Sequence, residues 1–363
     1  MKAVIIGFSH MHVNEIANYI HNNKSATLAA VSDVPSTVEK IPALRYTPEW
    51  NKQNVCENYC SNYYEDYKEM LDVEKPDVAY ILTENCQKPE VVEECAKRGI
   101  NVSIEKPLAV NLEEAKKIKN SVEKYGIKAV VNWPVMWREH TIKMKMAIDS
   151  GVVGKPVKLR YINGHTGPLG KGARHRGVSQ TAEEMTDELR EKTWWHQESH
   201  GGGVLLDICC YGCWFTRYYL GKGAKSVMSM AANLNTPFGD TNDNFGAAVR
   251  YDDKLSFIEG TWTTPRKLIP SGPMVICTDG VIVSTGGALE QAEIKAFDMF
   301  GNEVPVPEYK LEEKFNNMPC QLEAEGFDNV YEMLTLDANM DVMAILDAVI
   351  KSNKSKKEEE ISD

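Results

Sequence analysis

A lysine directly after a short apolar segment is the residue best suited to chemistry in this sequence. Val102 to Ile104 is predicted to be a buried parallel strand, and Glu105, Lys106 and Pro107 follow it. Pro107 fixes its own φ and biases Lys106 toward an extended conformation, so the chain leaves the strand in a defined direction. In open α/β sheets, ligands bind outside the carboxyl ends of the strands. Lys106 is therefore a candidate for ligand contact, and a surface turn with a solvated lysine explains this short motif equally well.

A second candidate group follows a run of three glycines. After Gly201 to Gly203 come Asp207 and Tyr211, which are four positions apart. If the chain is helical from Val204 onward, both side chains lie on one face, one turn apart, and can share a substrate hydroxyl. The alternative is an amphipathic helix with a half-buried tyrosine and with an aspartate near the positive end of the helix dipole. The cysteines in this stretch are expected to pack in the core.

The elements that must position these groups begin with a dinucleotide-binding pattern. An apolar segment, Ala3 to Ile6, ends at Gly7, and helical spacing follows over Val13 to Ile20. Only the first glycine of the Gly-x-Gly-x-x-Gly fingerprint is present, but Ser9 is small enough for a pyrophosphate to approach the helix amides. His12 stands where a small residue is usual, and a packed or partly exposed histidine is the simpler interpretation. The residues expected to contact the cofactor in this turn are Gly7, Phe8, Ser9, His10 and His12.

Further polar residues follow the next strands. Leu28 to Ser32 leads into Asp33, which lies 26 positions after Gly7, near the expected place for an acid that binds the adenosine ribose. No arginine occurs from Val34 to Val38 to bind a 2′-phosphate, so NAD is favoured over NADP. An aspartate in a plain turn is the alternative. The expected cofactor-binding set is completed by Thr83, Asn85, Glu105 and Lys106.

Length and pattern indicate two domains. At 363 residues the chain exceeds the usual single-domain size. Strands and helices alternate as far as residue 132, which predicts a doubly wound parallel sheet, whereas later segments are rich in strands and predict a mostly antiparallel sheet. We therefore expect a dinucleotide-binding α/β domain at 1–132, a second, α+β domain at 133–350 and a charged, disordered tail at 351–363.

Composition argues against several classes of protein. The 43% of hydrophobic and 26% of charged residues are those of an ordinary globular protein, and a net charge of −11 argues against nucleic-acid binding. No apolar run is long enough to cross a bilayer, and no export signal begins the chain, so a cytoplasmic protein without membrane contact is expected. An odd number of cysteines, nine, indicates free thiols rather than a disulfide framework.

Two long polar segments resist a functional assignment. Ile41 to Ser61 is longer than most connections and is interpreted as an insertion or a partly helical lid. Residues 164–203 contain four histidines, and their polarity and length suggest a cover over the substrate. His196 and His200 would share a face and invite a metal only on a helix, which the following glycines make unfavourable. No metal site is therefore expected.

Two motifs together resemble those of a known enzyme family. Glu105-Lys106-Pro107, followed about a hundred residues later by Gly-Gly-Gly-x-x-x-Asp-x-x-x-Tyr, is similar to the Gfo/Idh/MocA family of NAD(P)-dependent oxidoreductases. The resemblance spans nearly the whole chain. It implies an N-terminal Rossmann domain that binds the nicotinamide cofactor, and a C-terminal domain whose large open sheet covers the active site and often joins subunits. A homo-oligomer, such as a dimer or tetramer, and a small-molecule sugar, glycoside or polyol substrate are expected accordingly.

The resemblance also implies roles for individual residues. Lys106 matches the lysine that contacts the nicotinamide ribose and the substrate, and Asp207 matches the family aspartate. Tyr211 takes a position most often held by histidine; the branch that contains glucose-fructose oxidoreductase has tyrosine there. Lys88 stands where many relatives have histidine. Lys106, Asp207 and Tyr211 are thus the expected catalytic residues. The residues expected to bind the sugar are Trp137, Arg138, His165, Trp194, Trp195 and His196.

The expected reaction is hydride transfer from a carbinol carbon to NAD⁺, or its reversal. Tyr211 takes the hydroxyl proton and Lys106 stabilises the alkoxide; because a free tyrosine has a pKa of about 10, the ammonium must favour the phenolate. Since these two residues belong to different domains, the site must lie between the domains. The alternatives are oxidation of a glycoside at C3 with a retained cofactor, redox-assisted cleavage of a glycoside, and a non-catalytic NAD-binding sensor.

Overall fold

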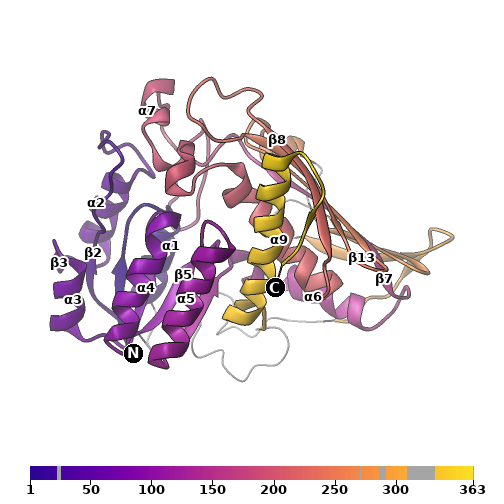
Figure 1. Cartoon of the computed structure of the whole chain (residues 1–363), viewed down its shortest axis with the longest axis horizontal. Coiled ribbons are helices and arrows are strands. Elements are labelled where there is room, and N and C mark those ends of the chain that lie inside the picture. The colour runs from indigo at the N-terminus through magenta and orange to yellow at the C-terminus, as the bar shows by residue number, and fades with distance from the viewer. Residues whose placement is uncertain (23–25, 270–271, 286–291, 309–331, 363) are drawn as a thin grey trace.

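The computed structural model is built on two sheets that lie side by side, with helices between them and on the outer side of the first sheet (Figure 1). It describes residues 1–22, 26–269, 272–285, 292–308 and 332–362. The first sheet has the strand order β3-β2-β1-β4-β5-β6, and every pairing in it is parallel. Its strands are β1 (Lys2–Ile6), β2 (Thr27–Ser32), β3 (Tyr63–Tyr64), β4 (Val78–Ile81), β5 (Asn101–Glu105) and β6 (Ala129–Asn132).

Helices follow these strands as the alternating pattern predicts, and the doubly wound parallel sheet is confirmed. They are α1 (Val13–Asn22), α2 (Pro48–Asn58), α3 (Tyr67–Glu74), α4 (Lys88–Lys97) and α5 (Leu112–Tyr125). The longest, α5, begins where the Asn111 side chain accepts a hydrogen bond from the amide of Glu114, and it ends at Gly126 in the left-handed region. Because all strands of the sheet are parallel, their carboxyl ends meet at one edge, where the polar residues predicted for the cofactor follow them.

The second sheet has nine strands in the order β14-β13-β12-β11-β7-β10-β9-β8-β15. Its pairings are antiparallel except that of β10 with β7, so the predicted mostly antiparallel sheet is confirmed. The strands are β7 (Pro156–Gly164), β8 (Ser226–Ala232), β9 (Asn244–Arg250), β10 (Leu255–Thr261), β11 (Met274–Cys277), β12 (Gly280–Thr285), β13 (Glu293–Asp298), β14 (Glu303–Val304) and β15 (Glu359–Glu360).

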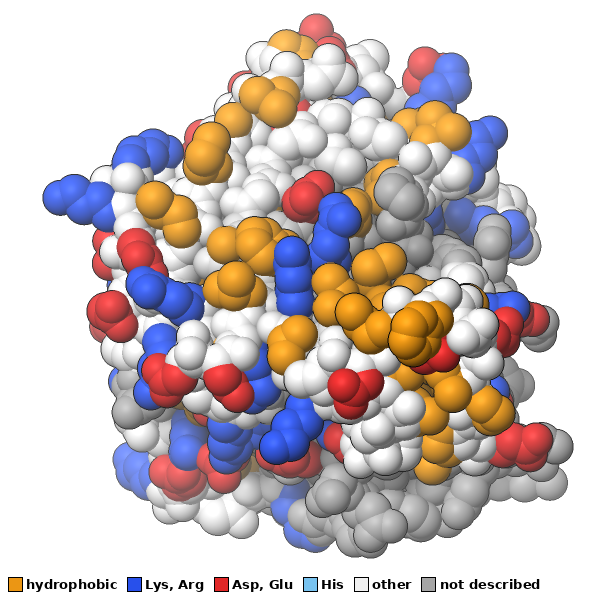
Figure 2. Space-filling view, turned by 90° about the vertical axis from the view of Figure 1, so that its right-hand side faces the viewer, with side chains coloured by type: hydrophobic (Ala, Val, Ile, Leu, Met, Phe, Trp, Pro, Cys, Tyr) orange, Lys and Arg blue, Asp and Glu red, His pale blue; other side chains and the backbone are white. Residues whose placement is uncertain are grey.

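Helices cover one face of this second sheet and leave the other face without a helical layer (Figure 1). The covering helices are α6 (Glu139–Asp149), α8 (Cys210–Leu220) and α9 (Leu336–Ser355), and the short α7 (Asp187–Glu191) lies apart from them. Figure 2 views the uncovered side, where hydrophobic side chains lie among lysines and arginines. On β8, Met228 and Met230 are 50% and 76% exposed.

The charged tail differs from expectation. Residues 351–363 were expected to be disordered, but α9 continues to Ser355, and β15 pairs with β8 at the end of the sheet. The hydroxyl of Ser226 donates to Glu358, and the hydroxyl of Ser352 donates to the carbonyl of Lys357. A run of charges therefore forms an ordered edge here, because its backbone pairs with β8 while its charged side chains remain in solvent.

No helix in the described ranges is both long and apolar enough to cross a bilayer. The eight cysteines in those ranges are free thiols, as predicted. The three that follow Asp207, namely Cys209, Cys210 and Cys213, are buried in the core.

The segment 41–61 has a structural role that its sequence did not reveal. Its helix α2 carries Asn51, whose amide donates to the carbonyl of Phe8 and accepts a hydrogen bond from Asn14 at the start of α1. The segment therefore braces the turn between β1 and α1. It is partly helical, as one of the two interpretations held.

Gly7 is the one residue of this turn whose conformation requires glycine. Its φ is +96°, and a Cβ added there would lie 2.7 Å from the backbone nitrogen of Thr83. A left-handed conformation combined with a backbone contact costs a side chain about 1–3 kcal/mol or more.

We predict that Gly7→Ala lowers the free energy of unfolding by at least about 1–3 kcal/mol, because of both strain and contact. Chemical denaturation monitored by tryptophan fluorescence measures the change. Gly246→Ala is the matched control, since a Cβ at Gly246 meets nothing within 4 Å, and it should change stability little. Equal stability of the two variants would contradict the assigned strain.

Candidate active site

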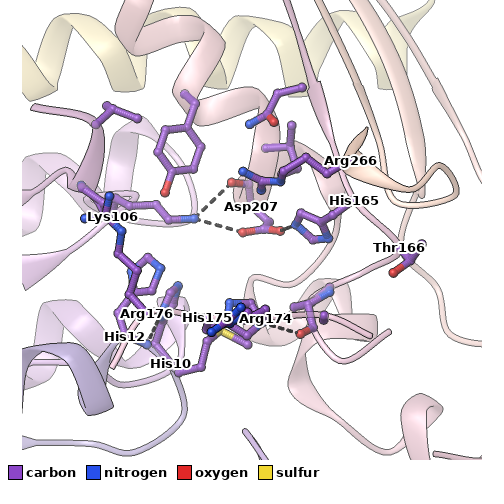
Figure 3. Close-up of a pocket in the computed structure, with 18 of the residues that line it drawn as sticks. His10, His12, Lys106, His165, Thr166, Arg174, His175, Arg176, Asp207 and Arg266 are labelled. Carbon is purple, nitrogen blue, oxygen red and sulfur yellow. Dashed lines mark hydrogen bonds and ion pairs between the residues drawn. The ribbon is translucent and has the colours of Figure 1, made fainter. Parts of the chain in front are cut away.

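A buried ion pair joins the two sheets at the centre of the site (Figure 3). The ammonium of Lys106, which follows β5, lies 3.0 Å from Oδ1 of Asp207 and 3.1 Å from the Asp207 carbonyl oxygen. Lys106 is 2% exposed and Asp207 8%. Asp207 belongs to a π-helical turn, Leu205–Cys209, that leads into α8. The predicted helix from Val204 onward thus begins with a wider turn, which points both the carbonyl and the carboxylate of Asp207 at the lysine.

The second carboxylate oxygen of Asp207 is held by two residues from the second sheet. Nε2 of His165, just after β7, lies 3.3 Å from Oδ2, and the indole nitrogen of Trp262, just after β10, donates to the same oxygen at 3.0 Å. Burial alone would raise the pKa of Asp207, but Lys106 and His165 outweigh it and hold that pKa well below its usual range. Asp207 is therefore an ionised carboxylate, and each of its two oxygens has a named partner.

Tyr211 presents its ring, rather than a hydrogen bond, to the lysine. The Lys106 ammonium lies 4.7 Å from the ring centroid, within cation–π range. Burial raises the pKa of Tyr211, and the opposing effect of Lys106 is too small to reverse it. The ammonium was expected to favour the phenolate; in this arrangement burial dominates, and Tyr211 is a neutral phenol. Burial also acts to lower the pKa of Lys106, yet Tyr211 and Asp207 together raise it well above the ordinary value.

Lys88 fixes the backbone on both sides of Lys106. Its fully buried ammonium donates to the side chain of Asn85 at 2.7 Å and to the carbonyls of Glu105 and Pro107 at 2.6 Å each. Burial is the main cause that lowers the pKa of Lys88 to about 7. Asn85 in turn donates to the carbonyl of Gly201 at 2.7 Å, which ties the strand end to the glycine run. Lys88, where the resemblance gives many relatives a histidine, therefore holds the backbone around Lys106.

Glu105 gathers the two histidines of the first turn. Its carboxylate lies 2.9 Å from Nδ1 of His12 and accepts a hydrogen bond from the amide of Asn132. Nε2 of His10 lies 3.9 Å from the same carboxylate and has no hydrogen-bond partner. Burial, followed by the charge of His12, holds the pKa of His10 well below its usual value. His12 therefore packs against Glu105, in keeping with the simpler interpretation of the sequence, a packed or partly exposed histidine.

His10, His12 and Glu105 are close enough to be considered as metal ligands. Nδ1 of His10 accepts a hydrogen bond from the amide of His12, so its proton lies on Nε2, the nitrogen that faces Glu105. A metal would need the lone pair of that same nitrogen. In this tautomer Nε2 of His10 is suited to donate a hydrogen bond to a ligand oxygen, and it is not suited to bind a metal.

A cavity of about 600 Å³ on the cofactor side fits the adenosine end of a dinucleotide. Its wall includes Ser9 and Asp33. One oxygen of Asp33 accepts hydrogen bonds from the amides of Phe8 and Val34, which orients the carboxylate at the end of β2. Burial raises the pKa of Asp33, so hydrogen bonds from a diol would relieve a desolvated group. The chemistry of this wall suits a ribose, and no arginine occurs from Val34 to Val38, although Lys40, Lys52 and Lys192 line the same cavity.

The aromatic residues of the covering segment lie on this cofactor side. The indole of Trp194 donates to the carbonyl of Ser9 at 3.0 Å, and Trp195 stacks on Trp194 with ring centroids 3.9 Å apart. Both line the cofactor-side cavity, not the one beside Lys106. The expected sugar contacts of Trp194 and Trp195 are therefore revised: these residues close the segment over the first turn.

Two other expected sugar contacts also lie away from the substrate side. His196 packs against Phe238 and Trp262, and Trp137 is buried in the main core. Neither lines the cavity beside Lys106. The physical reason is burial of large rings. The ring of His196 packs on that of Trp262, and Trp137, the last residue of the short 3₁₀ turn Pro134–Trp137, is buried in the core. His196 and His200 occupy separate 3₁₀ turns, Trp194–His196 and Glu198–His200.

The substrate-side cavity has a volume of about 400 Å³ and contains the remaining predicted residues. Its wall includes Lys106, Asp207, Tyr211, Arg138 and His165. The sequence did not single out several further contributors to this site, which are Trp262, Tyr161, Asn163, Arg174, Arg176 and Arg266. Only the alternation of the strands that carry Tyr161, Asn163 and Trp262 hinted at inward-facing side chains.

We predict that Asp207→Asn lowers the free energy of unfolding by about 3–5 kcal/mol, because it leaves a buried ammonium without its counter-charge. Adding Lys106→Met should recover part of that loss. The folded state lowers the pKa of Asp207, so its contribution is full above about pH 4, the carboxyl's unfolded pKa, and is lost as pH falls further. Denaturation at neutral and acidic pH measures both effects.

The matched control is Asp149→Asn, which breaks the exposed pair of Lys145 and Asp149 at 2.6 Å and should cost at most about 1 kcal/mol. Equal losses for Asp207→Asn and Asp149→Asn, or no recovery in the double variant, would contradict the assigned pair.

Comparison with protein families finds matches in both halves of the chain. Residues 1–133 match the oxidoreductase family with an NAD-binding Rossmann fold, and residues 141–283 match the Gfo/Idh/MocA C-terminal domain. Scyllo-inositol 2-dehydrogenase (NAD(+)) of Bacillus subtilis is 23% identical over 252 residues, which are 69% of this chain and 63% of that enzyme. Myo-inositol 2-dehydrogenase of Thermotoga maritima is 22% identical over 45% of this chain and 42% of its own length. The chain thus aligns with less than two thirds of these relatives.

Solved structures share the whole fold. Aldose-aldose oxidoreductase from Caulobacter crescentus, solved with glycerol, has a TM-score of 0.77 at 16% identity and covers 99% of each chain. GenD2 from gentamicin A biosynthesis, solved with NAD, has a TM-score of 0.74 at 17% identity over 100% of this chain and 97% of its own. With both domains matched by sequence and the architecture shared throughout, the chain belongs to the Gfo/Idh/MocA family of oxidoreductases, and its first domain is an NAD-binding Rossmann domain.

Proposed function

We propose that the protein interconverts a secondary alcohol and a ketone on a sugar or polyol, with NAD as the redox partner. The observation that carries this proposal is the buried Lys106–Asp207 pair, which lies in the wall of the substrate-side cavity and has His165 beside it. The dehydrogenases of inositols among the relatives act on such alcohols, which supports the same reaction class. NAD⁺, when bound, supplies the hydride acceptor for the oxidation.

Lys106 is the residue that stabilises the developing alkoxide. Its ammonium is held by Asp207 and by a backbone carbonyl, so it is already oriented before the substrate arrives. A charged donor that is fixed in a dry site stabilises an oxyanion more than the same donor does in water. Asp207 keeps the lysine charged and in place, and thus acts through it.

His165 is better suited than Tyr211 to take the hydroxyl proton. With Nε2–H directed to the Asp207 carboxylate, the lone pair of His165 is on Nδ1, and this nitrogen has no hydrogen-bond partner among the described residues. Asp207 would also stabilise the imidazolium that forms, as in other carboxylate–histidine pairs. Tyr211, a neutral phenol with a raised pKa, is assigned instead to orienting the substrate through its hydroxyl. Relatives most often have histidine at the position of Tyr211. In this protein an imidazole, that of His165 just after β7, contacts the Asp207 carboxylate instead.

A second candidate is oxidation of a glycoside at C3 with the cofactor retained between turnovers. One observation favours it: Trp194 bonds to the carbonyl of Ser9 and closes residues 164–203 over the first turn. A closed segment there would slow the release of a dinucleotide. In that case a second sugar would regenerate the cofactor, and no reduced nicotinamide would accumulate.

The reaction is tested by incubating the protein with NAD⁺ and a panel of pyranosides, glycosides and inositols, while reduced nicotinamide and keto sugar are both measured. We expect keto product from at least one substrate. Accumulation of both products indicates a dehydrogenase, and keto sugar without reduced nicotinamide indicates the retained-cofactor reaction. Lys106→Met should abolish both, because the alkoxide loses its cation. Cofactor binding without any product from the whole panel would indicate a non-catalytic sensor and overturn the proposal.

The assignment of the base is tested by two substitutions. His165→Gln should lower kcat by about 10²–10⁴-fold, the usual contribution of a general base. Tyr211→Phe removes one hydrogen bond and should cost only about tenfold, mostly in KM. Steady-state kinetics on the best substrate measure both. If Tyr211→Phe proves the more damaging in kcat and His165→Gln stays near the parental rate, the phenol is the base.

A further inference from the structure

The wall of the substrate-side cavity carries a marked excess of positive charge. Seven lysine and arginine side chains line it, but only two carboxylates do. Both carboxylates are already engaged: Asp207 pairs with Lys106, and Glu15 lies 3.3 Å from Arg176. The whole chain, in contrast, has a net charge of −11. The cavity is therefore a local positive region in a negative protein.

Two of these cations stand close to the reacting groups without counter-ions. Among the described residues, the guanidinium groups of Arg138 and Arg266 have neither an ion pair nor a hydrogen bond. The Nε atom of Arg138 is fully shielded from solvent and has no partner. A donor left in this condition is costly, since it has lost water and gained no partner. A bound oxygen ligand would remove that cost.

The charged groups of the cavity also affect Arg138. Burial, then the charges of Arg176 and Arg266, lower the pKa of Arg138 to about 10, against the opposing effect of Tyr211 and Tyr161. Like charges thus converge on the cavity, and neither Arg138 nor Arg266 has a carboxylate partner among the described residues. In Figure 3, Arg266 lies on one side of Asp207, and Arg174 and Arg176 lie on the other.

We propose that the cavity takes a sugar or polyol that bears an anionic group, a carboxylate or a phosphate ester, and that Arg138 and Arg266 bind that group. The inference rests on the proposed function and specifies the substrate class of the same site. A guanidinium presents parallel N–H donors that match two oxygens of a carboxylate or phosphate, which a neutral hydroxyl cannot do. By holding the anionic group, Arg138 and Arg266 would orient the sugar ring so that one of its carbinols faces Lys106 and His165.

The positive cavity would also direct the ligand into the site. An anion approaching a protein of net charge −11 is repelled at long range, and a cleft lined with one sign of charge focuses the field locally. Because the lining cations are partly buried, salt should weaken the interaction without abolishing it.

The test is calorimetric binding to the full-length protein in the presence of NADH, which permits no oxidation. The ligands are D-glucose, D-glucuronate and D-glucose 6-phosphate. At least one anion should bind about tenfold or more tightly than glucose, as expected for one charged hydrogen-bonded contact. Preference for glucuronate identifies a carboxylate site, and preference for the phosphate identifies a phosphate site. Equal affinities for all three ligands would overturn the inference.

Variants locate the anion on the two arginines. Arg138→Gln and Arg266→Gln should each reduce the ratio of anion to glucose affinity by about tenfold, whereas Arg138→Lys, which keeps the charge and loses the fork, should reduce it less. Lys222→Gln, an exposed lysine outside the cavity, is the matched control and should keep the parental ratio. Thermal melts confirm that each variant is folded. If Arg138→Gln does not fold, Arg266→Gln alone tests the anion site.

Further outcomes separate this inference from the proposed reaction. An unchanged ratio of anion to glucose affinity in both glutamine variants would overturn the assigned anion site. A loss of NADH affinity that matches the loss of anion affinity would also overturn it, because the arginines would then bind the cofactor phosphates. Turnover of neutral sugars without anion preference overturns the inference and leaves the reaction standing. Anion preference that depends on the arginines, without turnover of any substrate, supports the site and counts against the reaction.

Discussion

The structure depends on one buried charge pair, that of Lys106 and Asp207. Each group alone would be strongly disfavoured in the interior, and together they are stable only because the lysine also bonds to a carbonyl and the carboxylate also bonds to His165 and Trp262. The lysine comes from the edge of the first sheet, and the carboxylate with its partners comes from the second. The pair therefore constrains how the two sheets meet, and it forms part of the wall of the substrate-side cavity.

The surroundings of the pair explain why its lysine is so well ordered. Lys88 holds the backbone before and after Lys106, and Gly7 allows the first turn to approach Thr83. Glu105, one residue earlier, draws His12 toward the same edge. Two of these residues, Lys88 and His12, differ from the usual pattern of the family. Here the departures are accommodated by packing, and they leave the geometry around Lys106 intact.

Much of this arrangement could be predicted from the sequence. The alternation of strands and helices determined the parallel sheet, and the carboxyl ends of its strands had to bring Gly7, Asp33, Thr83 and Lys106 to one edge. The glycine run and the spacing of Asp207 and Tyr211 indicated which part of the second half would face them. Such features are local in sequence, so periodicity and turn chemistry are sufficient to find them.

Other features could not be predicted because they depend on contacts between distant segments. His165 and Trp262 reach Asp207 only because β7 and β10 are neighbours in the sheet, and that pairing has no signature in either strand. Trp194 and His196 read as sugar ligands in a polar segment, yet burial of their rings decided their places. The tail read as disordered from its charge, whereas an available edge on β8 orders it. The unpaired state of Arg138 is visible only when its surroundings are known.

The most direct test of the central claim is a crystal structure of the protein with NAD⁺. The account predicts that the nicotinamide ring lies beside the Lys106 ammonium, with its C4 facing the cavity that His165 and Tyr211 line, so that a carbinol carbon can approach to about 3–3.5 Å. A nicotinamide ring bound elsewhere, with the Lys106–Asp207 pair covered by protein and out of its reach, would contradict it.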